Sequence, residues 1–355
     1  MKSDESVAMD TVSTERLYAV CREDVHEFLD NDVAMTRLSD ANMERLSCGS
    51  LTSVEFNRAY RVVMTTSVDT TMSLFTLGSS GSHLLADFVF EKFPISAAKF
   101  TCRGEKVVLT GRRHYFKVYD LSSNKESHPI VPLSTHYEEK IDSVQISPIS
   151  DVAAFSGSEG VYLVDLRTFE KTATARVSGT VVSHCFAQDG DILNAFSSDG
   201  SVFMFDLRYN ARPMRRWNDY GYTGGCSLAT SHNSKFIACG SESGYVNIYA
   251  WEAVMTSSTR CPKPLKSVGN LTTAVDQLLF HPSDQLLYMS SSLQSAAARL
   301  VGQPFYGRGL PTLHCLHQDS WFSSRFASDG FFKTIICNVD AAHSTGAVLN
   351  HQLDD

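Results

Sequence analysis

The chain has 355 residues, 43% of them hydrophobic, and a formal net charge of -8 at pH 7. This apolar content is enough for a large core and excludes a chain that is disordered throughout. The 39 acidic residues outnumber the 31 basic residues, so the chain lacks the overall positive charge of proteins that hold nucleic acid mainly by its phosphates. The sequence has no run of about 18 apolar residues, which excludes a transmembrane helix, and its acidic first 30 residues do not resemble a secretory signal peptide. The nine cysteines, which form no Cys-x-x-Cys pair, predict buried thiols in a reducing compartment.

A repeat of about 44 residues runs through the chain. Each unit contains an apolar stretch that alternates with period two and ends near a polar or acidic residue, and we call this stretch the marker strand. The marker strands end near residues 76, 120, 165, 206 and 250, with spacings of 44, 45, 41 and 44 residues. A period of ~40–45 residues with strand-type alternation is typical of the blades of a WD-repeat β-propeller.

Each unit predicts four antiparallel strands. Before the marker strand comes a turn such as Ser198-Asp199-Gly200, where glycine supplies the positive φ of a tight hairpin. Residues 181–186 and 192–196 predict the two strands nearer the axis, and residues 214–217 predict an outer strand. A sixth marker strand is expected at residues 298–302, displaced by an insertion at 252–262.

These patterns predict an all-β fold, a seven-bladed WD-repeat-type β-propeller over residues 49–345, because the chain after residue 48 has room for about seven units. The seventh blade, residues 303–345, is poorly patterned, and residues 333–339 are its candidate marker strand. Residues 1–48 are expected to form a short, acidic, mostly flexible N-terminal extension. Residues 346–355 are expected to be a C-terminal tail.

Several stretches, collinear over roughly residues 50–302, go beyond the general repeat. The more specific one is Pro262-Lys263-Pro264-Leu265-Lys266 followed by Asn270-Leu271-Thr272-Thr273. The others are 90–95, 99–105, 227–231, 238–241, 244–249 and 298–301. Together they resemble the family of U3 small nucleolar RNA-associated protein 18, a WD-repeat component of the small-subunit processome.

The resemblance implies a non-enzymatic scaffold that supports pre-18S rRNA processing and small ribosomal subunit assembly in the nucleus and nucleolus. It implies other small-subunit processome proteins as partners, in the UTP-B subcomplex, and contact with U3 small nucleolar RNA or pre-rRNA within the assembly. It implies no membrane and no small-molecule substrate. Some family members recruit the exosome helicase through a Leu-Phe motif in a longer N-terminal extension, and residues 1–48 contain no such motif.

One basic and aromatic run is a candidate contact for RNA or a partner. It comprises Arg208, Arg212, Arg215, Arg216, Trp217, Tyr220 and Tyr222, and Arg112 with Arg113 forms a smaller version. Arginines would bind phosphate and flat side chains would stack on unpaired bases. The favoured alternative is an outermost strand whose charges block edge pairing, and a solvated turn for the smaller pair.

The acidic residues Asp120, Asp165 and Asp206 end marker strands, and we expect them to act structurally by accepting hydrogen bonds from nearby backbone N–H groups. Arg167 and Arg208 follow two of them as Asp-Leu-Arg. This short pattern resembles a box in propeller substrate receptors of cullin-type ubiquitin ligases, which is the alternative function.

The chain carries no Gly-x-Ser-x-Gly elbow, phosphate-binding loop, Gly-x-Gly-x-x-Gly or His-Glu-x-x-His motif. We therefore expect no enzyme, cofactor or metal; a propeller enzyme with a polar cluster in its central channel is the second alternative. His314, Cys315 and His317 are close in sequence, but on a strand residues 314 and 317 face opposite sides, so loop residues are favoured over a metal site.

Overall fold

The structure is a computed structural model. It describes residues 34–37, 42, 44–57, 60–78, 81–123, 125–133, 140–221, 224–269, 271–282, 284–293, 297–302, 313–315, 324–328, 333–338 and 348–354. The chain divides into two compact units, Met1–Asn31 and Asp32–Asp355, and all elements named below lie in the second. No helix in these ranges is long and apolar enough to cross a membrane.

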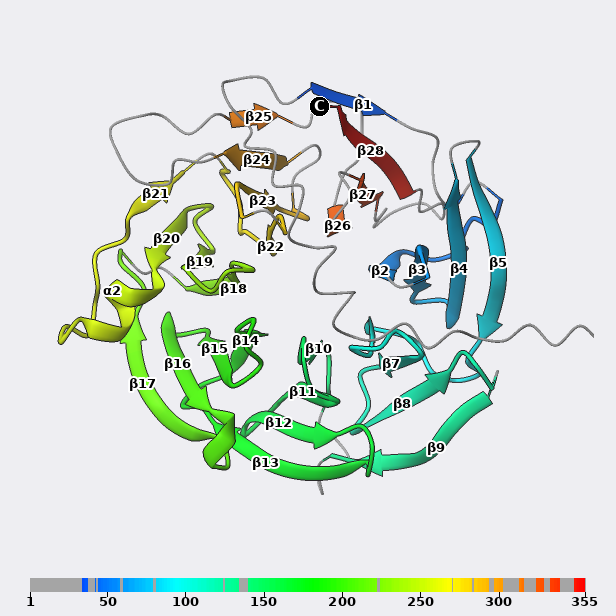
Figure 1. The fold of residues 1–355 in the computed structure, drawn as a ribbon, viewed down its shortest axis with the longest axis horizontal. Helices are drawn as coiled ribbons and strands as arrows, with labels where there is room; N and C mark the ends of the chain where they lie inside the picture. The colour runs from blue at the N-terminus through cyan, green and yellow to red at the C-terminus, as the bar shows by residue number, and fades with distance from the viewer. Residues whose placement is uncertain are drawn as a thin grey trace, which may run out of the picture. The chain divides into compact units, whose positions relative to one another are not determined.

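Six four-stranded antiparallel sheets follow one another in chain order as the blades of a propeller (Figure 1). Blade 1 has β2 (Leu51–Asn57), β3 (Val62–Ser67), β4 (Thr71–Gly78) and β5 (Gly81–Val89); blade 2 has β6 (Ala97–Phe100), β7 (Lys106–Thr110), β8 (Tyr115–Asp120) and β9 (Lys125–Pro132); blade 3 has β10 (Val144–Ile146), β11 (Val152–Gly157), β12 (Gly160–Asp165) and β13 (Glu170–Arg176). Within each blade, every strand pairs with the one before it, and the first is innermost.

The next three blades repeat this order. Blade 4 has β14 (Val181–Phe186), β15 (Ile192–Ser197), β16 (Ser201–Asp206) and β17 (Arg212–Asn218), with the short helix η1 (Leu207–Tyr209) before β17; blade 5 has β18 (Gly225–Thr230), β19 (Phe236–Ser241), β20 (Val246–Ala250) and β21 (Lys266–Val268); blade 6 has β22 (Gln277–Phe280), β23 (Leu286–Ser290), β24 (Ala298–Gly302) and β25 (Leu313–Cys315). Helix α2 (Trp251–Thr256) occupies the predicted insertion. The marker strands are the third strands β4, β8, β12, β16, β20 and β24, as predicted.

A further sheet joins two distant parts of the chain. Its order is β1-β28-β27-β26, with β1 (Ala34–Arg37), β26 (Ser324–Ser328), β27 (Lys333–Asn338) and β28 (Val348–Asp354). Residues 1–48 were expected to be a mostly flexible extension and residues 346–355 a tail, but each range supplies a strand. These two strands, β1 and β28, pair antiparallel. The propeller prediction is confirmed, whereas the six blades in chain order do not confirm the predicted number of seven.

Residues 333–338 of the candidate marker strand form β27, which lies between β26 and β28 in this sheet. The spacing rule assumed that all four strands of a unit are consecutive, whereas β1 of this sheet comes from the N-terminal part of the chain.

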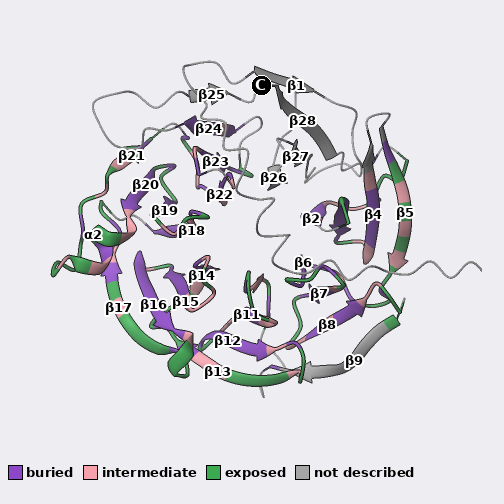
Figure 2. Ribbon diagram, in the orientation of Figure 1, coloured by how far each residue is buried: buried purple, intermediate pink, exposed green. Residues whose placement is uncertain are grey.

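The core lies between neighbouring blades. Val107 and Leu109 of β7 pack in a cluster with residues of β3 and β4, whereas Val108 packs in a different cluster with residues of β11 and β12. Successive side chains of a strand point to opposite faces of its sheet, so each inner strand fills two adjacent clusters. Five such clusters, built from described residues, each span two consecutive blades. Figure 2 shows burial concentrated on second and third strands such as β15, β16 and β19, while β13 and β17 remain largely exposed.

The expectation of buried thiols holds only in part. The six cysteines whose side chains are described are all free, but Cys48, Cys102 and Cys261 are exposed and, of the six, only Cys239 is fully buried. The three exposed thiols lie outside the strands, where period-two alternation does not predict which way a side chain points.

One histidine is part of the contact between blades 3 and 4. His184 of β14 is 1% exposed, and its Nε2 donates to the Ala154 carbonyl of β11 at 3.1 Å. Its Nδ1 accepts from the Ser143 hydroxyl at 3.5 Å. Burial lowers the pKa of His184 to about 4, because the charged imidazolium is poorly solvated there.

This pKa predicts acid sensitivity. Between pH 6.5 and about 4 the unfolded chain binds a proton at His184 that the folded chain does not, so stability falls as the pH falls through this window. From pH 7 to pH 5 the loss at this site should be roughly 2 kcal/mol. Denaturant unfolding of the wild type and of His184→Gln at both pH values measures it: the variant should lose less stability on acidification. Equal losses would contradict the assignment.

Candidate functional site

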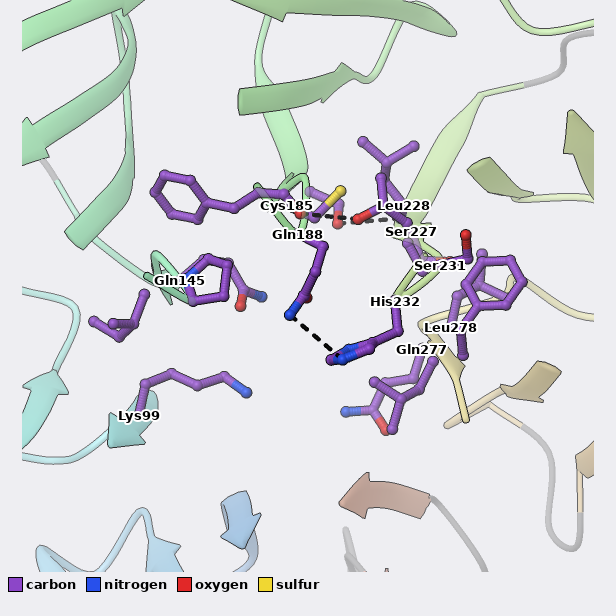
Figure 3. Close-up of a pocket in the computed structure, with 18 of the residues that line it drawn as sticks. Lys99, Gln145, Cys185, Gln188, Ser227, Leu228, Ser231, His232, Gln277 and Leu278 are labelled. Atoms are coloured by element: carbon purple, nitrogen blue, oxygen red, sulfur yellow. Dashed lines mark hydrogen bonds between the residues drawn. The ribbon is translucent and has the colours of Figure 1, made fainter. Parts of the chain in front are cut away.

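The innermost strands of the six blades surround a cavity of about 480 Å³ in the central channel (Figure 3). Lys99 of β6, Gln145 of β10 and Gln277 of β22 lie around it, and Gln188 and His232 come from the turns that follow β14 and β18. These long polar side chains come from five different blades and are directed towards the middle of the cavity. The channel therefore brings together polar side chains that are far apart in the sequence.

The charges of the lining nearly balance. The Lys99 ammonium lies 2.6 Å from the Glu55 carboxylate of β2, and burial raises the pKa of Glu55. The remaining charged lining residue is Asp276, whose carboxylate accepts a hydrogen bond from the Ser292 backbone N–H at 2.6 Å. With one lysine against two acidic residues, the cavity has no excess of fixed positive charge.

Hydrogen bonds between consecutive turns hold the cavity mouth. The backbone N–H groups of His232 and Asn233 donate to the Asp284 carboxylate of blade 6 at 2.6 and 2.7 Å. The Gln188 backbone N–H donates to the Ser234 hydroxyl at 3.3 Å, and its side-chain amide lies 3.4 Å from the His232 ring nitrogen Nε2. These contacts link the turns of blades 4, 5 and 6, so the positions of Gln188 and His232 are fixed by their neighbours.

The basic and aromatic run lies on and beside β17, the outermost strand of blade 4, which agrees with the alternative of an edge strand. Trp217 is 0% exposed and packs edge-on against Tyr249 at 4.8 Å between ring centroids. The prediction that Trp217 contacts RNA is therefore wrong for this fold, because no face of the indole is open to a base. Period two explains the burial, since Trp217 points inward while Arg216 points out.

Arg215, another predicted contact residue, is half-buried and bound within the chain. Its guanidinium donates to the backbone carbonyls of Met255 at 2.9 Å, Thr259 at 3.2 Å and Ser257. These carbonyls belong to the last turn of α2 and the segment after it, so Arg215 anchors the insertion to the edge of blade 4. The Asn218 backbone N–H donates to the Arg260 carbonyl at 2.6 Å and adds to this contact.

The other arginines of the run are not brought together. Arg208 and Arg212 lie at one end of the β16–β17 hairpin, whereas Arg216 lies towards the other end. Arg216 donates to the Ser201 hydroxyl at 3.1 Å, and Arg212 and Tyr220 are exposed. Tyr222 lies outside the described residues.

The pair Arg112 and Arg113 lies in the turn between β7 and β8, in blade 2. Arg112 is 3.5 Å from the Asp142 carboxylate, and Arg113 donates to the Lys92 carbonyl at 3.4 Å. Both side chains are exposed, which agrees with a solvated turn. This pair belongs to blade 2, whereas the arginines of β17 belong to blade 4. The two groups of arginines therefore lie on different blades.

The blade-end acids close the turns after their strands. Asp120 accepts hydrogen bonds from the backbone N–H groups of Ser122 and Ser123 at 2.9 and 3.2 Å. Asp165 and Asp206 accept from the backbone N–H groups two residues later at 2.8 and 3.0 Å.

The arginines of the two Asp-Leu-Arg boxes fold back onto their own acids. The Arg208 guanidinium donates to Asp206 at 2.8 and 3.0 Å and holds the pKa of that carboxyl below its ordinary value. Arg167 lies 3.7 Å from the Asp165 carboxylate. In each box the arginine therefore forms an ion pair with the aspartate two residues before it.

Sequence reasoning missed a buried polar network in blade 5. Asp219, which is 3% exposed, accepts hydrogen bonds from the Asn247 amide at 3.0 Å and the Tyr249 hydroxyl at 2.5 Å. Burial raises the pKa values of Asp219 and Tyr249. No Trp-Asp signature marks these positions, and the only signal in the sequence is a polar residue at an inward position of the marker strand, Asn247.

The described residues contain no group of three or more His, Cys, Asp or Glu side chains that could hold a metal ion. The candidate ligands His314, Cys315 and His317 fall outside the residues whose side chains are described. The described geometry is that of a β-propeller with a polar channel lined by its innermost strands and with largely exposed outer strands β13 and β17.

Comparison with known proteins shows which β-propeller proteins the chain is similar to. The chain is 31% identical over 272 residues to the U3 small nucleolar RNA-associated protein 18 homolog of Mus musculus, covering 76% of this chain and 49% of the relative. It is 32% identical over 270 residues to the homolog of Arabidopsis thaliana, covering 76% and 48%, and 25% identical over 315 residues to U3 small nucleolar RNA-associated protein 18 of Saccharomyces cerevisiae, covering 76% and 53%. No protein-family model matches the chain.

The matched region is therefore homologous to the U3 small nucleolar RNA-associated protein 18 family, which confirms the resemblance predicted from the sequence. The chain spans about half the length of the curated relatives it matches.

The anchoring role of Arg215 is testable. Arg215→Ala removes the donor for three carbonyls of residues 255–259, and leaving such groups unpaired costs about 1–3 kcal/mol. Hydrogen exchange of residues 251–262 should become faster, while Arg212→Ala on the same strand should leave it unchanged. Equal exchange in the two variants would show that Arg215 does not hold the insertion.

Proposed function

We propose that this chain is a non-enzymatic propeller scaffold of the U3 small nucleolar ribonucleoprotein, or small-subunit processome, that supports pre-18S rRNA processing and small ribosomal subunit assembly. The observation that carries the proposal is the 31% identity over 76% of the chain to proteins named for their association with U3 small nucleolar RNA. It follows that the chain works in the nucleolus, alongside other processome proteins that include the UTP-B subcomplex.

The proposed mechanism is presentation of surfaces by a rigid ring. The clusters between blades bury both faces of the inner strands, so the outer strands and turns keep fixed positions relative to one another. Partners that dock on different blades are then held at set distances. This role needs no reacting group, and it agrees with the lack of a catalytic signature in the sequence.

Direct RNA contact is proposed only for those predicted side chains that remain exposed. These are Arg112, Arg113, Arg208, Arg212, Arg216 and Tyr220, since Trp217 is buried and Arg215 is engaged with the insertion. Scattered over two blades, they suit several small contacts within an assembly better than a single RNA-binding groove, which would need clustered positive charge.

The function is tested by affinity purification of the tagged chain from cells, with RNA sequencing and mass spectrometry of the bound fraction. We expect enrichment of U3 RNA, ribosomal RNA precursors and UTP-B proteins over a tagged unrelated propeller. Absence of U3 RNA would overturn the proposal. Recovery of a cullin adaptor instead would favour the ubiquitin-ligase receptor, although Arg167 and Arg208 are each paired with their own acids.

We also propose that the sheet of β1, β28, β27 and β26 is a seventh blade that closes the ring. Strand β26, at the opposite edge of this sheet from β1, lies against β2 of blade 1 and also contacts β22 of blade 6. An innermost strand that touches the innermost strands on both sides occupies the position of a blade between them. The N-terminal strand β1 then completes the blade on the outside.

Ring closure predicts that the pairing of β1 with β28 stabilises the whole propeller. Met35→Pro combined with Thr36→Pro removes two consecutive backbone N–H groups, of which one faces β28. Unfolding should require about 1–2 kcal/mol less free energy, the value of a lost ladder hydrogen bond with its neighbours. The control, Met35→Ala with Thr36→Ala, keeps both N–H groups and should lose much less; equal stability of the two variants would argue against closure by β1.

A further inference from the structure

We propose that the mouth of the central channel is a docking site for a short, extended segment of a partner protein. The proposal rests on the proposed scaffold function and names one place where a partner is held. The site comprises the cavity lined by the innermost strands and by the turns that carry Gln188 and His232.

The size of the cavity fits such an occupant. Its volume of about 480 Å³ lies within the ~300–1,000 Å³ range of ligand sites in proteins. Its walls come from all six blades described in chain order, so a segment inside it would contact side chains from several blades. The hydrogen-bonded turns of blades 4, 5 and 6 keep the mouth preformed, which reduces the entropy lost on binding.

The polar groups of the cavity match a peptide backbone. Gln145, Gln188 and Gln277 line it from three different blades (Figure 3), and each side-chain amide offers both donors and an acceptor. The Gln145 side-chain amide makes no hydrogen bond to another described residue, and the Gln188 side-chain amide makes a long contact of 3.4 Å with the His232 ring. A peptide backbone, which presents alternating N–H and C=O groups, supplies the complementary partners.

Apolar side chains lie beside these amides. Ile146 follows Gln145 and Leu278 follows Gln277, and both line the cavity. An extended peptide has a polar backbone and side chains that alternate in direction, so it can use both kinds of surface together.

Charge disfavours a nucleic-acid occupant. The fixed charges of the lining are Lys99, Glu55 and Asp276, and Lys99 is already paired with Glu55. A phosphate backbone is held mainly by excess positive charge, which this cavity lacks. The expected occupant is a segment of neutral or basic character rather than an acidic one.

The first experiment replaces Leu278 by the photoreactive residue p-benzoylphenylalanine in cells, with the same replacement of Thr172 on the outer strand β13 as the control. After irradiation, mass spectrometry identifies the attached peptide. We expect one short segment of one protein at position 278 that is not attached at position 172. Crosslinks to RNA alone, or none at position 278, would overturn the proposal.

The second experiment measures binding of that segment, as a synthetic peptide, to the purified chain. Gln145→Leu combined with Gln188→Leu should weaken binding by at least tenfold, whereas Glu170→Gln with Arg176→Gln on β13 should not change it. Gln145→Asn with Gln188→Asn serves if the leucine variant fails to fold, and it should also weaken binding. Equal affinity of wild type and channel variants would overturn the proposal.

The co-purification and peptide-binding experiments together show whether the docking site or the scaffold function is wrong. If U3 RNA co-purifies with the wild-type chain but no peptide is bound in the channel, only the docking site is wrong. If U3 RNA does not co-purify, the proposed function itself fails, whatever the channel binds.

Discussion

The burial of apolar side chains between neighbouring blades is the interaction on which the rest of the structure depends. A sheet inside the ring has no face left for solvent, so its inner strands are apolar at consecutive positions, as Val107, Val108 and Leu109 show. Sheets buried on both faces need such runs. The same requirement favours polar side chains on the outer strands, in the turns and along the axis, and long polar groups therefore collect in the channel.

The local repeat was readable from the sequence because every blade meets the same requirement. Alternation, turn residues and a near-constant period located the marker strands from β4 to β24, and β14 has the predicted bounds. The last sheet could not be located in this way. It combines β1 with β28 across almost the whole chain, and a pairing between distant segments leaves no mark in a local period.

The candidate contacts were harder to predict, because the sequence shows a residue type but not its direction or its neighbours. Trp217 and Arg216 are adjacent, yet one is fully buried and the other is half exposed. The sequence suggests that Arg215 is a free cation, but in the structure it donates to carbonyls of the inserted segment. The channel cavity and the Asp219 network were missed for a related reason: each is assembled from residues that only the fold brings together.

The strand pair β1 and β28 has a consequence for how the protein is made. Residues 34–37 leave the ribosome early and residues 348–354 late, so the early strand must wait for its partner during synthesis. Chain closure over so long a separation is entropically costly and slows folding. A nascent chain can assemble its blades one by one, but β1 can pair only after β28 has been synthesised. Until then the edges of both strands are open to other chains or chaperones.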